Sequence, residues 1–263
     1  MKGFARIIFV LALLSPLHVY AQSQDPRVTR LRDRILERIP DVPSARRGLG
    51  RGSARSSYAT RHAAAIVRAS DMYESEWVSF VERGNWQSFT PHTDLPNLIA
   101  AIAYKESAFQ PVVRLDNNTR VFSVRDMSPN RRARRRARGD MGFMQVRVPG
   151  AVARQCGAVR ADMQRLLEDY NFNYQIGTCI LTKSLAAYVE RYTQRSYRRM
   201  GHNQRPRHVR SFFVRDNPDL QDLVVIERYN WGGRDLYDHR VASGYARRVL
   251  REYLFFRGDN ERG

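Results

Sequence analysis

Three features are scarce in this sequence, and each scarcity narrows the class of protein. The apolar stretch Ile7–Leu17 is too short to span a bilayer and no later segment replaces it, so no transmembrane segment is expected. The two cysteines and six histidines show no metal-ligand spacing, so neither a metal nor a cofactor is expected. Strand-like alternation is confined to short segments, which favours a mainly α fold with a small irregular or β-like element.

The first residues have the order of a secretory signal peptide. Lys2 and Arg6 precede the apolar stretch, and Val19–Ala21 supplies the small residues that a signal peptidase needs before Gln22. We expect residues 1–21 to be removed, leaving a periplasmic or secreted protein. No lipid anchor is expected, because the residue after the cleavage point is not a cysteine. A retained amphipathic anchor is the alternative.

The net positive charge and the two cysteines are both consistent with an exported protein. The net charge is +19, of which the two cations of residues 1–21 contribute two, leaving +17. Such charge attracts polyanions, and for an exported chain these are anionic envelope components rather than nucleic acid. A codon usage that favours arginine is the alternative explanation for part of this excess of positive charge. Cys156 and Cys179 should form a disulfide in an oxidising compartment, with a contribution of about 3 kcal/mol; two buried free thiols are the alternative.

Composition divides the mature chain into a tail and one domain. Residues 22–57 are rich in Arg, Ser, Gly and Pro and are expected to form a basic linker, in which Val28–Ile39 could be a short helix. A single domain is expected over residues 58–258. Two basic insertions, 117–139 and 195–218, should lie on its surface because their like charges disfavour compact packing.

Local patterns predict the elements of this domain. A helix should begin near Asp94, with Pro96 in its first turn, and end by Phe109. Further helices are expected over Met163–Glu168, Asn173–Tyr192, Leu220–Arg228 and Val241–Phe256, and short strands over Val112–Leu115, Val121–Val124 and Phe143–Val148.

Glu106 continues an apolar helical face. The face consists of Leu95, Leu98, Ile99, Ile102 and Ala103. Three more residues lead to Glu106, which therefore lies on the buried side of the helix at its end. Burial disfavours a carboxylate and raises its pKa, which is the property a general acid needs near neutral pH. A structural glutamate paired with an arginine is the alternative.

Five short segments follow one another in a recognisable order. They are Ala103–Pro111 with its Glu-Ser pair, Gly142–Gln145, Asn173–Gly177, Tyr229–Gly232 and Tyr245–Leu250. In this order they resemble the motifs of the soluble lytic transglycosylase family: a Glu-Ser motif with the catalytic acid, Gly-Leu-Met-Gln, Asn-x-x-x-Gly, Ala-Tyr-Asn-x-Gly and a terminal Tyr-x-x-x-Val-Leu helix. Each segment alone is a weak signal, whereas five in order are a strong one.

The resemblance implies a goose-type-lysozyme-like fold over roughly residues 95–253, and Glu106 as the catalytic acid. The substrate-binding residues that it implies are Ser107, Met144, Gln145, Asn173, Tyr229 and Asn230. The chain departs from the family where residues 117–139 roughly double the distance from Glu106 to Gln145. It also departs at Arg228, where the family usually has a small residue.

The family's reaction needs only one carboxylic acid. Glu106 would protonate the bond between N-acetylmuramic acid and N-acetylglucosamine in peptidoglycan glycan strands, then act as base while a 1,6-anhydro ring closes. One alternative is a goose-type lysozyme-like hydrolase of peptidoglycan or chitin, for which Asp140 could be a second acid. Another is a catalytically silent wall-binding module. Arg131–Arg138 could bind anionic wall components beside the substrate cleft or be a solvated loop.

Overall fold

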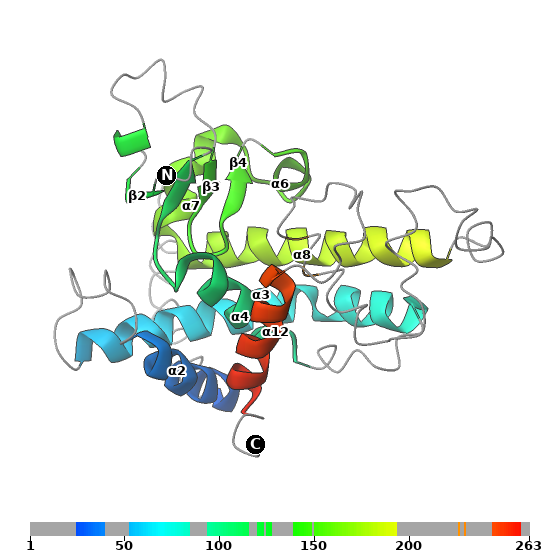
Figure 1. Cartoon of the computed structure of the whole chain (residues 1–263), viewed down its shortest axis with the longest axis horizontal. Coiled ribbons are helices and arrows are strands. Elements are labelled where there is room, and N and C mark those ends of the chain that lie inside the picture. Colours follow the sequence, from blue (N-terminus) through cyan, green and yellow to red (C-terminus); the bar gives the residue numbers. More distant parts are fainter. Residues whose placement is uncertain are drawn as a thin grey trace, which may run out of the picture.

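The computed structural model describes residues 25–39, 53–84, 94–115, 120–123, 125–127, 139–148, 150–193, 226, 229 and 244–258. This part of the chain is mostly helical and carries one small antiparallel sheet, as the sequence predicts (Figure 1). The helices are α2 Pro26–Arg38, α3 Ser53–Gly84, α4 Leu95–Ser107, η4 Arg125–Met127, α6 Ala151–Gln155, η5 Arg160–Asp162, α7 Met163–Glu168, α8 Tyr170–Thr193 and α12 Gly244–Arg257. The strands are β1 Val113–Leu115, β2 Arg120–Val121, β3 Gly139–Met141 and β4 Val146–Val148.

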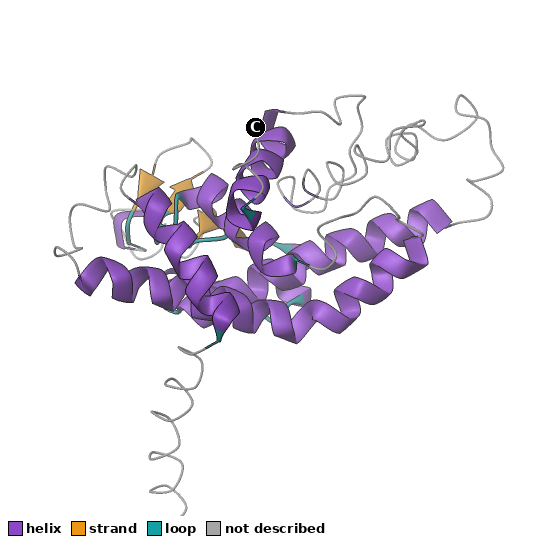
Figure 2. Ribbon diagram, turned by 90° about the horizontal axis from the view of Figure 1, so that it is seen from below, coloured by secondary structure: helices purple, strands orange, loops and turns teal. Residues whose placement is uncertain are grey.

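The two long helices α3 and α8 run side by side, and the strands gather at one end of the molecule (Figure 2). A buried contact joins the two helices directly, because Nδ1 of His62 and the hydroxyl of Tyr174 lie 2.6 Å apart. Rings of Tyr58, Phe109 and Phe143 surround His62 at centroid distances of 4.5–5.2 Å. This aromatic cluster fixes α3 against both α8 and the segment that follows α4.

Helix α4 lies in the core on nearly every side. Ile99 and Ile102 of the predicted stripe are 0% exposed, and so are Ala100 and Ala101, which stand outside that stripe. A helix that is apolar all round is a buried helix. Its burial, against α3 and α12, carries its last turn and Glu106 into the interior.

Residues 25–39, within the stretch 22–57 expected to be mainly linker, contain the short helix that the sequence allowed over Val28–Ile39. They form α2, in which Val28, Leu31 and Ile35 line one buried face at helical spacing. The carboxylate of Asp25 accepts a hydrogen bond from the first turn of α2 and caps it. Because α3 also begins at Ser53, the packed helices begin before residue 58, where the domain was expected to start.

The sheet has the order β2-β1-β3-β4, and every pair is antiparallel. Successive residues of a strand point to opposite faces, so the register determines which side chains share a face of the sheet. Val113, Met141 and Val146 are paired across the strands and are at most 1% exposed, and they form the inner face. Strand β3 was not predicted, because Gly-Asp-Met has little strand propensity and borders the basic insertion.

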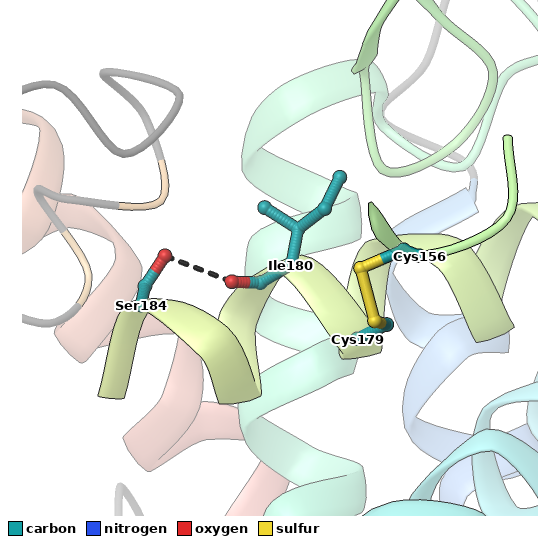
Figure 3. The surroundings of a disulfide bond; sticks show 4 residues. All are labelled: Cys156, Cys179, Ile180 and Ser184. Atoms are coloured by element: carbon teal, nitrogen blue, oxygen red, sulfur yellow. Dashed lines mark hydrogen bonds between the residues drawn. A yellow bond between two sulfur atoms is a disulfide. The ribbon is translucent and has the colours of Figure 1, made fainter. Parts of the chain in front are cut away.

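The predicted disulfide between Cys156 and Cys179 is confirmed (Figure 3). It ties the end of α6 to the middle of α8 and closes a loop of 23 residues. On the next turn of α8, the hydroxyl of Ser184 donates to the carbonyl of Ile180 at 2.8 Å, which satisfies this buried side chain within the helix.

Several predictions fall wholly or mostly outside the described residues. They are the signal peptide 1–21, the arginine run Arg131–Arg138, the insertion 195–218 and Asn230; of the helix expected over Leu220–Arg228, only Ile226 is described, and it is buried. Within the described ranges, no helix is long and apolar enough to cross a membrane.

Candidate active site

Glu106 lies on the last turn of α4, immediately before a strained stretch of backbone. Ala108 and Phe109 follow in the left-handed region, with φ of 52° and 61°, and Gln145 is a third such residue with φ of 48°. These are the only non-glycine residues with positive φ in the described ranges. Each costs on the order of 1–3 kcal/mol, and such strain concentrates at functional sites. All three belong to the two motifs around Glu106 and Gln145.

Contacts from distant elements hold this strained segment in place. The hydroxyl of Tyr58 on α3 donates a short hydrogen bond to the carbonyl of Phe109. The hydroxyl of Ser107 donates to the carbonyls of Phe143 at 2.8 Å and Ala103 at 3.1 Å. The surrounding fold therefore keeps the backbone beside Glu106 in a conformation that a free chain would avoid.

The Glu106 carboxyl is 6% exposed and has two neighbours that approach it directly. The hydroxyl of Tyr245 on α12 donates to Oε1 at 2.5 Å. The guanidinium of Arg114 on β1 lies 4.0 Å from Oε2, and it donates instead to the Glu106 backbone carbonyl at 3.0 Å. The closest partner of the acid is therefore a neutral hydroxyl, and its nearest cation is at the limit of an ion pair.

Burial raises the pKa of the Glu106 carboxyl to about 7. The hydrogen bond from Tyr245 and the charge of Arg114 oppose this rise in pKa, while the negative charge of Asp140 adds to it. The C-terminal end of a helix also disfavours a carboxylate, since the helix dipole is negative there. A large fraction of Glu106 is thus protonated near neutral pH, and the group can both give and take a proton.

The turn 142–145 packs against α8 through close contacts. Gly142 has φ of 75°, and a Cβ there would lie 2.2 Å from the side-chain nitrogen of Asn173. A Cβ on Gly177 would lie 2.6 Å from Cβ of Met144. Both glycines are needed for this approach, which positions Gln145 near Val112, just before β1.

Three of the expected substrate-binding residues use their polar side-chain groups inside the protein, and a fourth, Met144, is fully buried. Asn173 is 0% exposed, donates to the carbonyls of Met141 and Leu166 and accepts from the Met144 amide. Tyr229 donates to the Met144 carbonyl at 2.5 Å. Ser107 is bonded as described above, and Met144 is 0% exposed. Asn173, Tyr229 and Ser107 therefore hold the backbone around the site through these bonds, while the substrate contacts expected of these residues and of Met144 stay a prediction.

Gln145 differs from those four residues. Its amide nitrogen donates to the carbonyls of Val112 and Gly142 at 2.8 and 2.7 Å, but its Oε1 is buried without a hydrogen-bond partner among the described residues. A buried acceptor left unpaired costs free energy. Gln145 therefore has one buried acceptor that the described part of the protein leaves unsatisfied.

Three contributors were not assigned to Glu106 from the sequence: Tyr245, Arg114 and, as an electrostatic neighbour, Asp140. The motif that begins at Tyr245 was recognised, yet its contact with an acid 139 positions away leaves no local signal.

Burial raises the pKa of the Tyr229 hydroxyl well above its usual value, and the charges of Glu106 and Asp140 add to this effect. Tyr229 therefore stays a neutral donor to the Met144 carbonyl.

Within the described ranges, no group of three or more His, Cys, Asp or Glu residues is arranged to hold a metal ion. Comparison with protein-family models, curated proteins and solved structures gave no match to this chain.

Proposed function

We propose that this chain is a peptidoglycan lytic transglycosylase with a goose-type-lysozyme-like fold. It would cleave the bond between N-acetylmuramic acid and N-acetylglucosamine and leave a 1,6-anhydro end. The observation that carries the proposal is Glu106, a buried carboxyl with a pKa near 7 at the strained end of α4. The ordered motifs around it and the mostly helical fold with a small sheet support the same conclusion.

In this mechanism Glu106 acts first as an acid. Tyr245 occupies Oε1 as a donor, so the transferable proton is on Oε2. That proton passes to the glycosidic oxygen, which leaves as the hydroxyl of N-acetylglucosamine. The substrate's acetamido group stabilises the positive charge that develops on the muramic acid ring, and the hydrogen bond from Tyr245 and the charge of Arg114 stabilise the new carboxylate.

Glu106 then acts as a base. Its carboxylate takes the proton of the 6-hydroxyl of the same muramic acid residue while that oxygen bonds to the anomeric carbon. The ring closes, no water is consumed, and Glu106 returns to its protonated form. Gln145 is suited to accept the acetamido N–H through its unpaired Oε1, which would hold the group in place.

Digestion of purified peptidoglycan tests this proposal. Glu106→Gln should lower the release of soluble fragments by about 10²–10⁴-fold, since it removes the only transferable proton. Glu252→Gln is a matched control, because Glu252 is a second buried glutamate, 7% exposed, on the same helix as Tyr245. Unchanged release by Glu106→Gln would overturn the proposal, and release absent from the wild type as well would favour a wall-binding module.

A hydrolase on the same site is the second candidate, and one observation favours it. The charge of Asp140 is felt at Glu106, so a second carboxyl lies close enough to influence the acid. A hydrolase would use such a group to activate water. However, Asp140 already forms an ion pair with Arg147 at 3.4 Å, which engages one of its carboxylate oxygens. The mass of the products separates these two reactions.

A further inference from the structure

One face of the sheet carries a row of charged residues that the proposed mechanism does not use. Register places Arg120 opposite Arg114, Arg114 opposite Asp140, and Asp140 opposite Arg147. Directly paired residues project from the same face of a sheet. We call Arg120, Arg114, Asp140 and Arg147 the charged row; it crosses all four strands and spans about 14 Å.

The charged row is a costly arrangement for the folded protein alone. Arg120 and Arg114 are directly opposite each other, and like charges in that position are destabilising. Asp140 is the only acid in the row and forms its ion pair with Arg147. Among the residues described, no carboxylate pairs with Arg120, which is exposed. With three arginines and one aspartate, the row has a formal charge of +2, which would favour an anionic ligand.

The charged row also adjoins the candidate active site. Arg114 belongs to both, because its guanidinium donates to the Glu106 carbonyl and lies 4.0 Å from the Glu106 carboxyl. A ligand group bound along the row would therefore lie beside the acid. The side chains of Arg114 and Arg147 are 28% and 40% exposed, so part of each side chain remains accessible.

We propose that the charged row binds carboxylates of the substrate strand, on the lactyl groups or peptide stems of muramic acid next to the cleaved bond. Guanidinium groups form paired, charge-assisted hydrogen bonds with carboxylates, which gives both affinity and orientation. The row would then select anionic peptidoglycan over a neutral glycan such as chitin. The identity of this ligand rests on the proposed function, whereas the preference for carboxylate does not.

Calorimetric binding of a defined ligand pair tests the proposal. The ligands are a peptidoglycan tetrasaccharide with peptide stems and the same fragment with its carboxylates converted to amides. All proteins carry Glu106→Gln, so cleavage does not interfere. At low ionic strength the free-acid fragment should bind about tenfold or more tightly than the amide, and high salt should reduce this preference.

The variant Arg120→Gln/Arg147→Gln should lose most of that preference while its binding of the amidated fragment changes little. The matched control is Arg30→Gln/Arg83→Gln, which removes the same charge from exposed positions on α2 and at the end of α3. This control should keep the preference, and thermal unfolding should confirm that both variants are folded.

A preference that survives in Arg120→Gln/Arg147→Gln, or one lost equally in the control, would overturn the proposal, as would equal or absent binding of both fragments. A wild-type protein that prefers the free acid but releases no fragments from peptidoglycan would contradict the proposed function and leave the carboxylate site standing. The two failures are therefore distinguishable.

Discussion

Glu106 and Glu252 are the same residue type at nearly the same exposure, 6% and 7%, yet their surroundings differ. Glu252 on α12 lies 2.9 Å from the guanidinium of Arg38 on α2, and this guanidinium also stacks on the ring of Phe255 at 3.7 Å. Glu106 receives a hydroxyl from Tyr245, while its nearest cation is 4.0 Å away. One buried acid is neutralised by a direct partner and the other is not.

The difference separates a structural glutamate from a reactive one. A buried carboxylate with a direct guanidinium partner joins two helices through an ion pair. A buried carboxyl with only a hydroxyl close by pays for desolvation by holding its proton to higher pH. Glu252 therefore occupies within this molecule the role that was the alternative explanation for Glu106.

The largest expected effect of replacing these two glutamates is on the free energy of unfolding, which the two replacements should change in opposite directions. Glu252→Gln should lower the free energy of unfolding at pH 8 by about 1–3 kcal/mol, because Arg38 loses its partner but is partly exposed. Glu106→Gln should raise it at the same pH by on the order of 2–3 kcal/mol. Urea denaturation of the two variants and the wild type measures both changes.

The sign for Glu106 follows from its raised pKa. Its folded-state pKa of about 7 exceeds the ordinary glutamate value of 4.5, so the folded protein loses stability as pH rises through that interval. Glutamine does not titrate, so the gain from Glu106→Gln should be complete above pH 7 and should vanish below about pH 4.5. A gain that is the same at both ends of this range would show that the carboxyl does not titrate as described.

A smaller effect is expected from Tyr245→Phe on the pH dependence of activity. Wild-type kcat/KM should fall as pH rises through about 7, because the acid must be protonated. The hydroxyl of Tyr245 stabilises the carboxylate, so its loss should move this fall to higher pH, by up to about one pH unit. A kcat/KM profile from pH 5 to 9 measures the shift, and a move to lower pH would contradict the assigned hydrogen bond.

The smallest effect is expected from Asp140→Asn, in the opposite direction. The charge of Asp140 raises the pKa of Glu106, so its removal should move the fall in kcat/KM to lower pH by about a few tenths of a unit. Activity at pH 6 should remain close to that of the wild type. A loss of about 10²-fold or more at that pH would instead make Asp140 a second catalytic acid.

Sequence periodicity was sufficient where the decisive contacts are local. It predicted α4, the position of Glu106 on its buried face, and α7 with its bounds Met163–Glu168. It missed β3, because a three-residue strand is stabilised by its neighbours rather than by its own residues. It also treated α2 mainly as linker, since many arginines outweighed a face of three apolar residues.

The candidate site shows the same division. The apolar stripe indicated Glu106 and the resemblance to the family motifs indicated Gln145, but the pairing of Glu106 with Tyr245 links positions 139 residues apart. Nor can residue type show whether a polar side chain is already satisfied. Asn173 was expected to bind substrate, yet all of its hydrogen bonds go to the protein's own backbone. Where hydrogen-bonding capacity is used depends on tertiary packing.

The most direct test of the central claim is mass spectrometry of the products released from purified peptidoglycan. The account predicts fragments that end in 1,6-anhydro muramic acid, lighter by one water than hydrolysis products, released by the wild type and by Glu252→Gln but not by Glu106→Gln. Fragments with ordinary reducing ends would contradict the ring-closing reaction, and anhydro fragments released equally by Glu106→Gln would contradict the role of Glu106.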